Sequence, residues 1–347
     1  MTLTDVPFTV RALTSAYAEG ANPRDVVDAA FDRIAAADDP ALFIHLRSRD
    51  AVLAEVAALG ARGADRPLWG MPFVVKDNID VGGLPTTAAC PAYAFTPDRD
   101  ATVVARLRGA GAILIGKANL DQFATGLVGM RSPYGVPRNA VDPAIVPGGS
   151  SSGSAVAVAR GIAAFSLGTD TAGSGRVPAA LNNIVGLKPT LGALPATGVV
   201  PACRTLDTIS VFAHTVDDAY AVFVAAAGRD PQDPYSRDAA TPPLGAVPPG
   251  SRVGVPDAAS RVFFGDDEQA RMFDAALAHL AAQGAEIVEV DLAPFHAVAG
   301  LLYDGAWVAE RHAVVADLMA RQPEALHPVT RAIIAKAETL TAADAFR

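Results

Sequence analysis

Two glycine- and serine-rich segments constrain the fold of this chain more than any other feature. Residues 148–154 read Gly-Gly-Ser-Ser-Ser-Gly-Ser, and residues 168–174 read Gly-Thr-Asp-Thr-Ala-Gly-Ser. Glycine tolerates tight turns and close backbone approach, so we expect two turns in which backbone N–H groups crowd together and a serine hydroxyl stands exposed. Such turns indicate an acyl-transfer site, because clustered N–H groups stabilise an oxyanion.

Composition excludes several classes of protein. The 347 residues are 51% hydrophobic and 19% charged, as in a globular protein, and the formal net charge of −9 argues against a nucleic-acid partner. The two cysteines, Cys90 and Cys203, are too few and too far apart for a disulfide framework or a cysteine-based zinc site. The N-terminus does not resemble a signal peptide, and no apolar run is long enough to span a membrane. We therefore expect a cytoplasmic enzyme without a membrane partner.

The hydrophobic pattern of the first half predicts an α/β fold. Residues 1–60 show helical spacing and should form an N-terminal helical wrapper, with Pro23 in the first turn of a helix after Asn22. Apolar runs at 73–75 and 113–115 flank a helical stretch around 103–107, which indicates parallel strands joined by a right-handed crossover. A helix over 155–160 and a strand over 163–167 would place both glycine-serine segments at the ends of elements, where α/β folds bind ligands.

The second half continues this pattern. A helix near 217–227 is followed by a proline-rich loop over 231–249, and the runs 252–255 and 286–290 flank a helix over 267–283 as a further β-α-β unit. Residues 341–347 read as the opening of a helix cut off after about two turns. We therefore expect a chain that is incomplete at its C-terminal end.

The first segment also satisfies G-x-S-x-G, which would make Ser151 the nucleophile of a hydrolase elbow. That interpretation requires a downstream acid and histidine. The downstream histidines lie outside glycine-rich or loop-marked contexts; they are His214, His279, His296, His312 and His327. The elbow interpretation also leaves the second segment without a role.

A lysine is the alternative base. Lys76 ends the apolar run 71–75, so it should leave a buried strand, where loss of hydration lowers the pKa of an ammonium group. A neutral amine can accept a proton from serine directly or through a second hydroxyl. The competing structural interpretation is an ion pair between Lys76 and Asp77 or Asp80.

Lys76, the run 148–151 and the segment 168–178 together resemble the amidase signature family, in both order and spacing. The resemblance extends from about residue 8 to the end of the chain. It implies an α/β fold with a central mixed β-sheet covered by helices on both faces. Residues 71–210 would be the catalytic core and residues 211–347 the remainder. Members normally continue beyond this point, often with a separate C-terminal domain, which we expect to be absent here.

The resemblance also implies site residues. Ser174 would be the nucleophile, Ser150 a bridging serine after a cis peptide bond, and Lys76 the base of a Ser-Ser-Lys triad. The backbone N–H groups of Thr171, Ala172, Gly173 and Ser174 would form the oxyanion hole. Asp170 and Arg176 would brace the loop, in a structural or a catalytic role. The family implies no metal or organic cofactor and tends to form homodimers.

Two departures from the common family pattern, Ser152 and Gly175, resemble the allophanate hydrolase branch, which acts on urea-1-carboxylate in urea breakdown. The segment 303–311 resembles the carboxylate-binding helix of that branch. In a continuous helix, Tyr303, Trp307 and Arg311 would share one face, and Tyr303 and Arg311 would hold the carboxylate of a small anionic amide. Gly126 would line the pocket. The structural alternative is that Arg311 pairs with Glu310 or caps a helix.

Other functions stay open at this point. Residues 111–118 nearly match a phosphate-binding loop, but the final Ser/Thr is missing and the interior reads as a buried strand. A broader amidase, including the amidase subunit of an aminoacyl-tRNA amidotransferase, is an alternative enzyme. A truncated, non-catalytic protein that keeps the amidase fold is an alternative of a different class.

Overall fold

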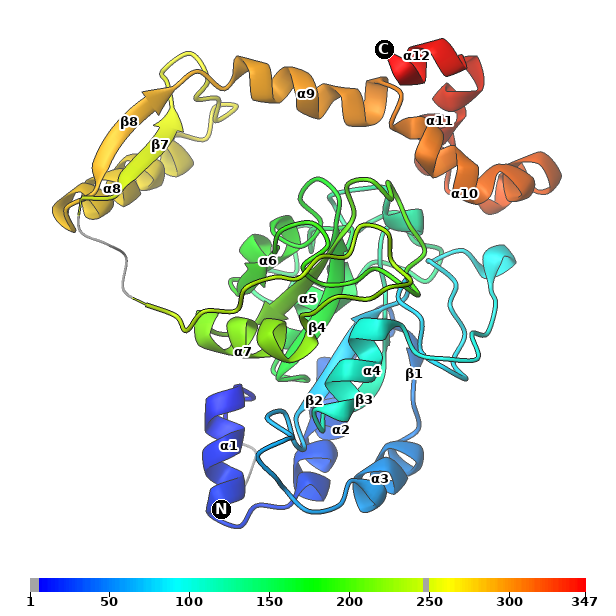
Figure 1. The fold of residues 1–347 in the computed structure, drawn as a ribbon, viewed down its shortest axis with the longest axis vertical. Coiled ribbons are helices and arrows are strands. Elements are labelled where there is room, and N and C mark those ends of the chain that lie inside the picture. The colour runs from blue at the N-terminus through cyan, green and yellow to red at the C-terminus, as the bar shows by residue number, and fades with distance from the viewer. Residues whose placement is uncertain (1–5, 246–249) are drawn as a thin grey trace. The chain divides into compact units, whose positions relative to one another are not determined.

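The computed structural model describes residues 6–245 and 250–347, which form two compact units (Figure 1). One unit consists of the residues up to Thr241 together with Val308–Arg347, and the other of Pro242–Trp307. Both glycine-serine segments lie in the larger unit. Among the described helices, none is both long and apolar enough to cross a membrane.

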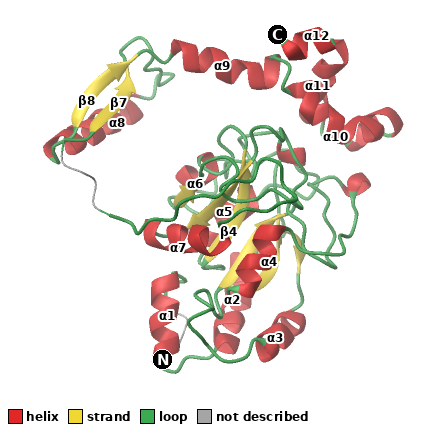
Figure 2. Ribbon diagram, viewed as in Figure 1, coloured by secondary structure: helices red, strands yellow, loops and turns green. Residues whose placement is uncertain are grey.

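A six-stranded sheet lies at the centre of the larger unit, with helices around it (Figure 2). Its strand order is β1-β3-β2-β4-β6-β5. β2 pairs in parallel with β3 and β4, whereas β1, β6 and β5 join antiparallel, so the expected mixed sheet is confirmed. The strands are β1 (Phe43–Leu46), β2 (Pro72–Lys76), β3 (Ile113–Ala118), β4 (Phe165–Asp170), β5 (Val185–Leu187) and β6 (Thr208–Ala213).

The connections put helices on both faces of the sheet. α4 (Thr102–Gly109) joins β2 to β3, and α5 (Ser152–Ala159) precedes β4 on the return across β2. The two crossovers run in opposite directions, so right-handed connections place α4 and α5 on opposite faces. α7 (Val216–Ala226) packs with α4, and the short α6 (Val177–Leu181) packs with α5.

The N-terminal segment is mostly helical but also contributes a strand. Its helices are α1 (Val10–Ala18), α2 (Pro23–Ala37) and α3 (Arg49–Ala58), and α2 begins with Pro23 after the cap Asn22, as expected. The prediction of a purely helical wrapper over 1–60 is wrong for β1, which pairs antiparallel with β3. That strand depends on a partner distant in the sequence, so local helical spacing does not reveal it.

Both glycine-serine segments begin or end at regular elements, as predicted. β2 ends at Lys76, its neighbour β4 ends at Asp170, and α5 starts at Ser152. Because β2 and β4 are parallel, their carboxyl ends lie at the same edge of the sheet. That edge carries the candidate site.

The remaining elements follow the predicted order. In the smaller unit β7 (Arg252–Pro256) and β8 (Glu286–Val290) are parallel and joined by α8 (Asp267–Ala282), as expected, and α9 (Ala293–Asp304) follows. Residues 246–249 of the predicted proline-rich loop lie outside the described residues. In the larger unit, α10 (Val308–Arg321), α11 (Pro328–Ala335) and α12 (Ala342–Phe346) complete the chain. Short 3₁₀ turns occur at Pro91–Tyr93, Gln122–Ala124, Pro323–Ala325 and Lys336–Thr339.

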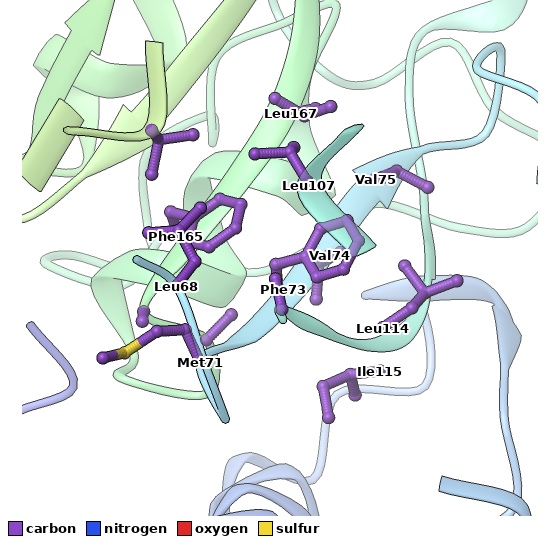
Figure 3. Packing of buried hydrophobic residues seen from close by; sticks show 14 of the residues in the cluster. Leu68, Met71, Phe73, Val74, Val75, Leu107, Leu114, Ile115, Phe165 and Leu167 are labelled. Carbon is purple, nitrogen blue, oxygen red and sulfur yellow. The ribbon is translucent and has the colours of Figure 1, made fainter. Parts of the chain in front are cut away.

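The buried core joins the parallel strands to the helices. Side chains from β2, β3, β4 and α4 meet in one apolar layer (Figure 3). Within it, the rings of Phe73 and Phe165 stack with centroids 5.2 Å apart and an interplanar angle of 13°. This layer fixes the ends of β2 and β4 relative to each other, and therefore the positions of Lys76 and Asp170.

We expect Phe165→Ala to lower the free energy of unfolding by about 3–5 kcal/mol, because it removes a fully buried ring from a close-packed layer. Phe346→Ala is the matched control, since Phe346 is 92% exposed; its effect should stay within about 0.5 kcal/mol. Urea unfolding of both variants measures the difference. Equal losses would contradict this assignment of the core.

Candidate active site

Lys76 binds two hydroxyl groups inside the protein. It is fully buried, and its Nζ lies 2.7 Å from Ser150 Oγ and 2.8 Å from Thr169 Oγ1. The competing interpretation, an ion pair of Lys76 with Asp77 or Asp80, does not describe what holds this side chain. Asp77 instead pairs with Lys117 at 3.1 Å, and Asp80 accepts a hydrogen bond from Thr86 at 2.8 Å.

Burial also determines the charge of Lys76. Loss of hydration lowers the pKa of its ammonium group from 10.5 to about 7, although the charges of Asp121, Asp207 and Asp170 oppose the shift. The positive charge of Arg311 adds to it. Near neutral pH, a sizeable fraction of Lys76 is therefore an uncharged amine that can accept a proton from Ser150.

The backbone around Ser150 leaves no room for side chains at the two preceding positions. The Gly149–Ser150 peptide bond is cis, and Gly148 has φ +76°. A Cβ on Gly148 would lie 2.7 Å from Pro178 Cα, and one on Gly149 would lie 2.1 Å from Asp121 Oδ2. Both glycines are thus required by contacts, and they fix Ser150 in its buried position.

Ser174 lies in the second turn and bonds to Gly126, which packs against the same carboxylate. Its Oγ donates to the carbonyl of Gly126 over 3.4 Å. A Cβ on Gly126 would lie 2.5 Å from Asp121 Oδ2, the atom that also limits Gly149. The Asp121 N–H donates in turn to the Ser150 carbonyl over 3.0 Å. Asp121 therefore connects the first turn, which carries Ser150, to the peptide that binds Ser174.

The backbone N–H groups of the second turn are open for a ligand. In the described part of the chain, no hydrogen bond uses the N–H groups of Thr171, Ala172, Gly173 or Ser174. The turn is held by Asp170, which accepts from the Gly175 N–H at 3.0 Å and from two nitrogens of Arg176 at 2.9 and 3.0 Å. Asp170 and Arg176 thus brace the loop, and the four N–H groups can serve as an oxyanion hole.

Ser151 does not have the surroundings of a hydrolase elbow. It lies at the N-cap of α5, is fully buried, and donates from Oγ to the Thr169 carbonyl over 3.2 Å. Among the described hydrogen bonds, none joins Ser151 to a histidine. Its neighbour Ser152 is also buried, with Oγ 3.4 Å from the Asn119 carbonyl. Both serines anchor the first turn internally.

Arg311 brings a buried positive charge to the site. It is 2% exposed on α10, and its Nη1 donates to Thr125 Oγ1 over 2.8 Å. The next residue, Gly126, accepts from Ser174. Two consecutive residues therefore bind the cation and the candidate nucleophile, so both lie against the segment 125–126.

The expectation of one helix through 303–311 is wrong. α9 ends at Asp304, Gly305 takes an extended conformation (φ −115°, ψ −169°), and α10 begins at Val308. Glycine favours such a break because it is a poor helix former. Half-buried Tyr303 is thus in the smaller unit and Arg311 in the larger one, with Trp307 in the turn between α9 and α10. Tyr303, Trp307 and Arg311 therefore do not share the face of one helix.

The sequence reasoning missed Thr169 and Thr125. Thr169 belongs to the second glycine-serine segment and is a polar residue near the end of a fully buried strand, which is a readable signal. Thr125 precedes Gly126 in an irregular segment, and nothing local indicates that its hydroxyl meets Arg311. In the described residues, no cluster of His, Cys, Asp or Glu is arranged to hold a metal ion.

Comparisons with known proteins point to one family. The family model for Amidase matches residues 25–344. The chain is similar to urea amidolyase from Lachancea kluyveri, with 51% identity over 284 residues, 81% of this chain. It is also similar to the solved structure of Kluyveromyces lactis allophanate hydrolase, with TM-score 0.90 and 44% identity over 97% of this chain. One glutamyl-tRNA(Gln) amidotransferase subunit, from Koribacter versatilis, is 42% identical over 71% of it.

The matches cover only part of the relatives. This chain spans 15% of the Lachancea kluyveri protein, 56% of the solved Kluyveromyces lactis chain and 53% of the Koribacter versatilis protein. Similarity therefore establishes the family and the fold of the part that is shared.

We expect Gly149→Ala to lower the free energy of unfolding by about 1–3 kcal/mol, because the new methyl group would overlap Asp121 Oδ2 and the Gly129 nitrogen. Gly109→Ala is the control. It lies at the end of α4 with nothing within 4 Å of the added carbon, so it should stabilise by about 0.5–1 kcal/mol. Urea unfolding curves measure both, and a neutral Gly149→Ala would contradict the packing described around Asp121.

Proposed function

Because this chain belongs to the amidase family, we propose that it hydrolyses the terminal amide of allophanate (urea-1-carboxylate), releasing ammonia in urea breakdown. The observation that carries this proposal is the buried Arg311 beside the candidate nucleophile. A guanidinium grips a carboxylate through two parallel N–H bonds. Since consecutive residues bind Arg311 and Ser174, a substrate that reaches both would carry a carboxylate as well as the amide carbonyl.

Ser174, Ser150 and Lys76 form the proposed catalytic triad. Neutral Lys76 takes the proton of Ser150 over 2.7 Å, and Ser150 takes that of Ser174 as the latter attacks the amide carbonyl. Collapse of the tetrahedral intermediate breaks the C–N bond, and the same relay returns the proton to the departing ammonia. Water then attacks the acyl-enzyme and regenerates Ser174.

Backbone N–H groups supply the proposed stabilisation of the intermediate. The N–H groups of residues 171–174 are unused by described partners, so they can bind the negative oxygen without first breaking internal bonds. Loss of one such donor typically costs ~10²–10³ in rate. By analogy with the branch that the sequence resembles, Gly126 is proposed to contact the amide end of the substrate, and a role for Tyr303 in binding the carboxylate stays a prediction of that resemblance.

The proposal also covers the partners, cofactors, compartment and oligomeric state of the protein. The substrate is small and anionic, and the net charge of −9 speaks against a nucleic-acid partner. The chemistry assigned to the triad requires no metal or organic cofactor. We propose a cytoplasmic homodimer, on the strength of the family resemblance. The similarity to an amidotransferase component makes a neutral amide the principal alternative substrate.

An ammonia-release assay with allophanate, malonamate, urea and a neutral amide tests the substrate. We expect Arg311→Met to lower kcat/KM for allophanate roughly 10²-fold, the value of a charge-assisted contact to the carboxylate, and to change that for the neutral amide less than about threefold. Exposed Arg331 provides the matched control, Arg331→Met, which should leave both values unchanged.

Three outcomes would contradict parts of the proposal. Equal activity of the wild-type chain on neutral amides would overturn the allophanate assignment. Ammonia release that survives in Ser174→Ala would overturn the nucleophile, since removal of a nucleophile should cost at least about 10³-fold. A uniform loss in Arg311→Met on all substrates would assign Arg311 a structural role.

The pH dependence of kcat/KM should show a single rising limb with an apparent pKa of about 7. Lys76 can accept a proton only when neutral, so activity falls about tenfold per pH unit below that value and levels off above it. Measuring the same limb with allophanate and with a neutral amide excludes ionisation of the substrate as its origin. A flat profile between about pH 6 and 8.5 would contradict the role of Lys76 as base.

A further inference from the structure

The loop 202–207 contacts the turn that carries Thr171 and the helix that carries Arg311. One of its ends is bonded to the turn that carries the proposed oxyanion hole, and its middle is bonded to the helix that carries Arg311. We propose that Thr205 and Glu310 are positioning residues that hold Arg311 at a fixed place relative to that turn, and so determine affinity for the carboxylate of the substrate. This inference rests on the proposed function and extends it to residues outside the triad.

The first contact fixes the loop to the catalytic turn. Asp207 is buried and accepts from Thr171 Oγ1 at 2.5 Å, from the Ala202 N–H at 2.8 Å and from the Cys203 N–H at 3.2 Å. Its carboxylate therefore closes the loop on itself and ties it to the first residue of the proposed oxyanion hole.

The second contact fixes the loop to α10. Glu310 accepts from the Thr205 N–H at 3.0 Å and from Thr205 Oγ1 at 2.5 Å. Both bonds involve a charged acceptor, which makes them stronger than neutral hydrogen bonds. Glu310 is thereby engaged with the loop, which accounts for this carboxylate without the Arg311–Glu310 pair that the sequence left open.

Arg311 depends on this contact because of its position in the helix. α10 begins at Val308, so Glu310 and Arg311 both belong to its first turn. The first turn of a helix has N–H groups without intrahelical partners and frays unless it is tied down. The Glu310 bonds to Thr205 tie it, and an acidic group there also suits the positive end of the helix dipole.

The buried guanidinium of Arg311 also lies near the 202–207 loop. Its guanidinium is close enough to the Cys203 thiol to lower the pKa of that thiol, although burial dominates and raises it to about 12. Arg311 thus lies between Thr125 on one side and the 202–207 loop on the other. Moving α10 by a fraction of a bond length would change the separation of the carboxylate site from the oxyanion hole.

Kinetics of three variants of the full chain test the proposal. We expect Glu310→Ala, which removes both bonds, to raise KM for allophanate roughly tenfold, and Thr205→Val, which removes one, about threefold. In both, kcat and the kcat/KM for a neutral amide stay within about twofold, because the triad and the Asp207 contacts remain. Glu310→Gln keeps an acceptor and should restore most of the affinity.

The outcomes separate this proposal from the proposed function. Asp317→Ala, an exposed acidic position on the same helix, is the matched control and should behave as the wild type. An unchanged KM for allophanate in Glu310→Ala, or equal losses on both substrates, would overturn the positioning role alone. A wild-type chain that hydrolyses the neutral amide but not allophanate would overturn the proposed function, and this extension with it.

Discussion

The removal of Lys76 from water is the constraint on which the site depends. An ammonium group in the core is costly unless it is solvated by other polar groups. Here two hydroxyls, those of Ser150 and Thr169, take the place of water at 2.7 and 2.8 Å. They compensate only part of the lost hydration, so the pKa of the ammonium group falls to about 7. Every side chain of β2, which ends at Lys76, is buried, and this links core packing directly to the chemistry proposed for the site.

Asp121 fixes the backbone around the two turns. Its carboxylate accepts from the Gly129 N–H at 2.9 Å and the Arg131 N–H at 2.8 Å, and it leaves no space for a side chain at Gly149 or Gly126. The two glycine-serine turns therefore meet around a charged residue that belongs to neither. Asp170 and Asp207 similarly hold the second turn, through Gly175, Arg176 and Thr171. Three buried carboxylates thus organise a site whose proposed reactive groups are neutral.

Much of this arrangement could be predicted from the sequence, because it is encoded in contiguous segments. The strand that ends at Lys76, the turns that carry Ser150 and Ser174, and the β-α-β order are local patterns. What escaped prediction depends on contacts between distant residues. β1 is a strand only because β3 pairs with it, and the contact of Thr125 with Arg311 spans 186 positions. The error over 303–311 is different in kind. Spacing by fours predicts a shared helical face only if the helix is continuous, and Gly305, a poor helix former in the same segment, already argues against that.

Because the charge of Arg311 acts on Lys76, a substrate bound to Arg311 would change the pKa of Lys76. In the chain alone, the guanidinium charge lowers the pKa of the Lys76 ammonium. A carboxylate bound to Arg311 would offset that charge, so the pKa of Lys76 would rise when an anionic substrate enters. The amine would become more basic at the moment when it must take a proton, whereas a neutral amide would bring no such change. In this site the correct substrate would complete the electrostatics of the base as well as occupy the pocket.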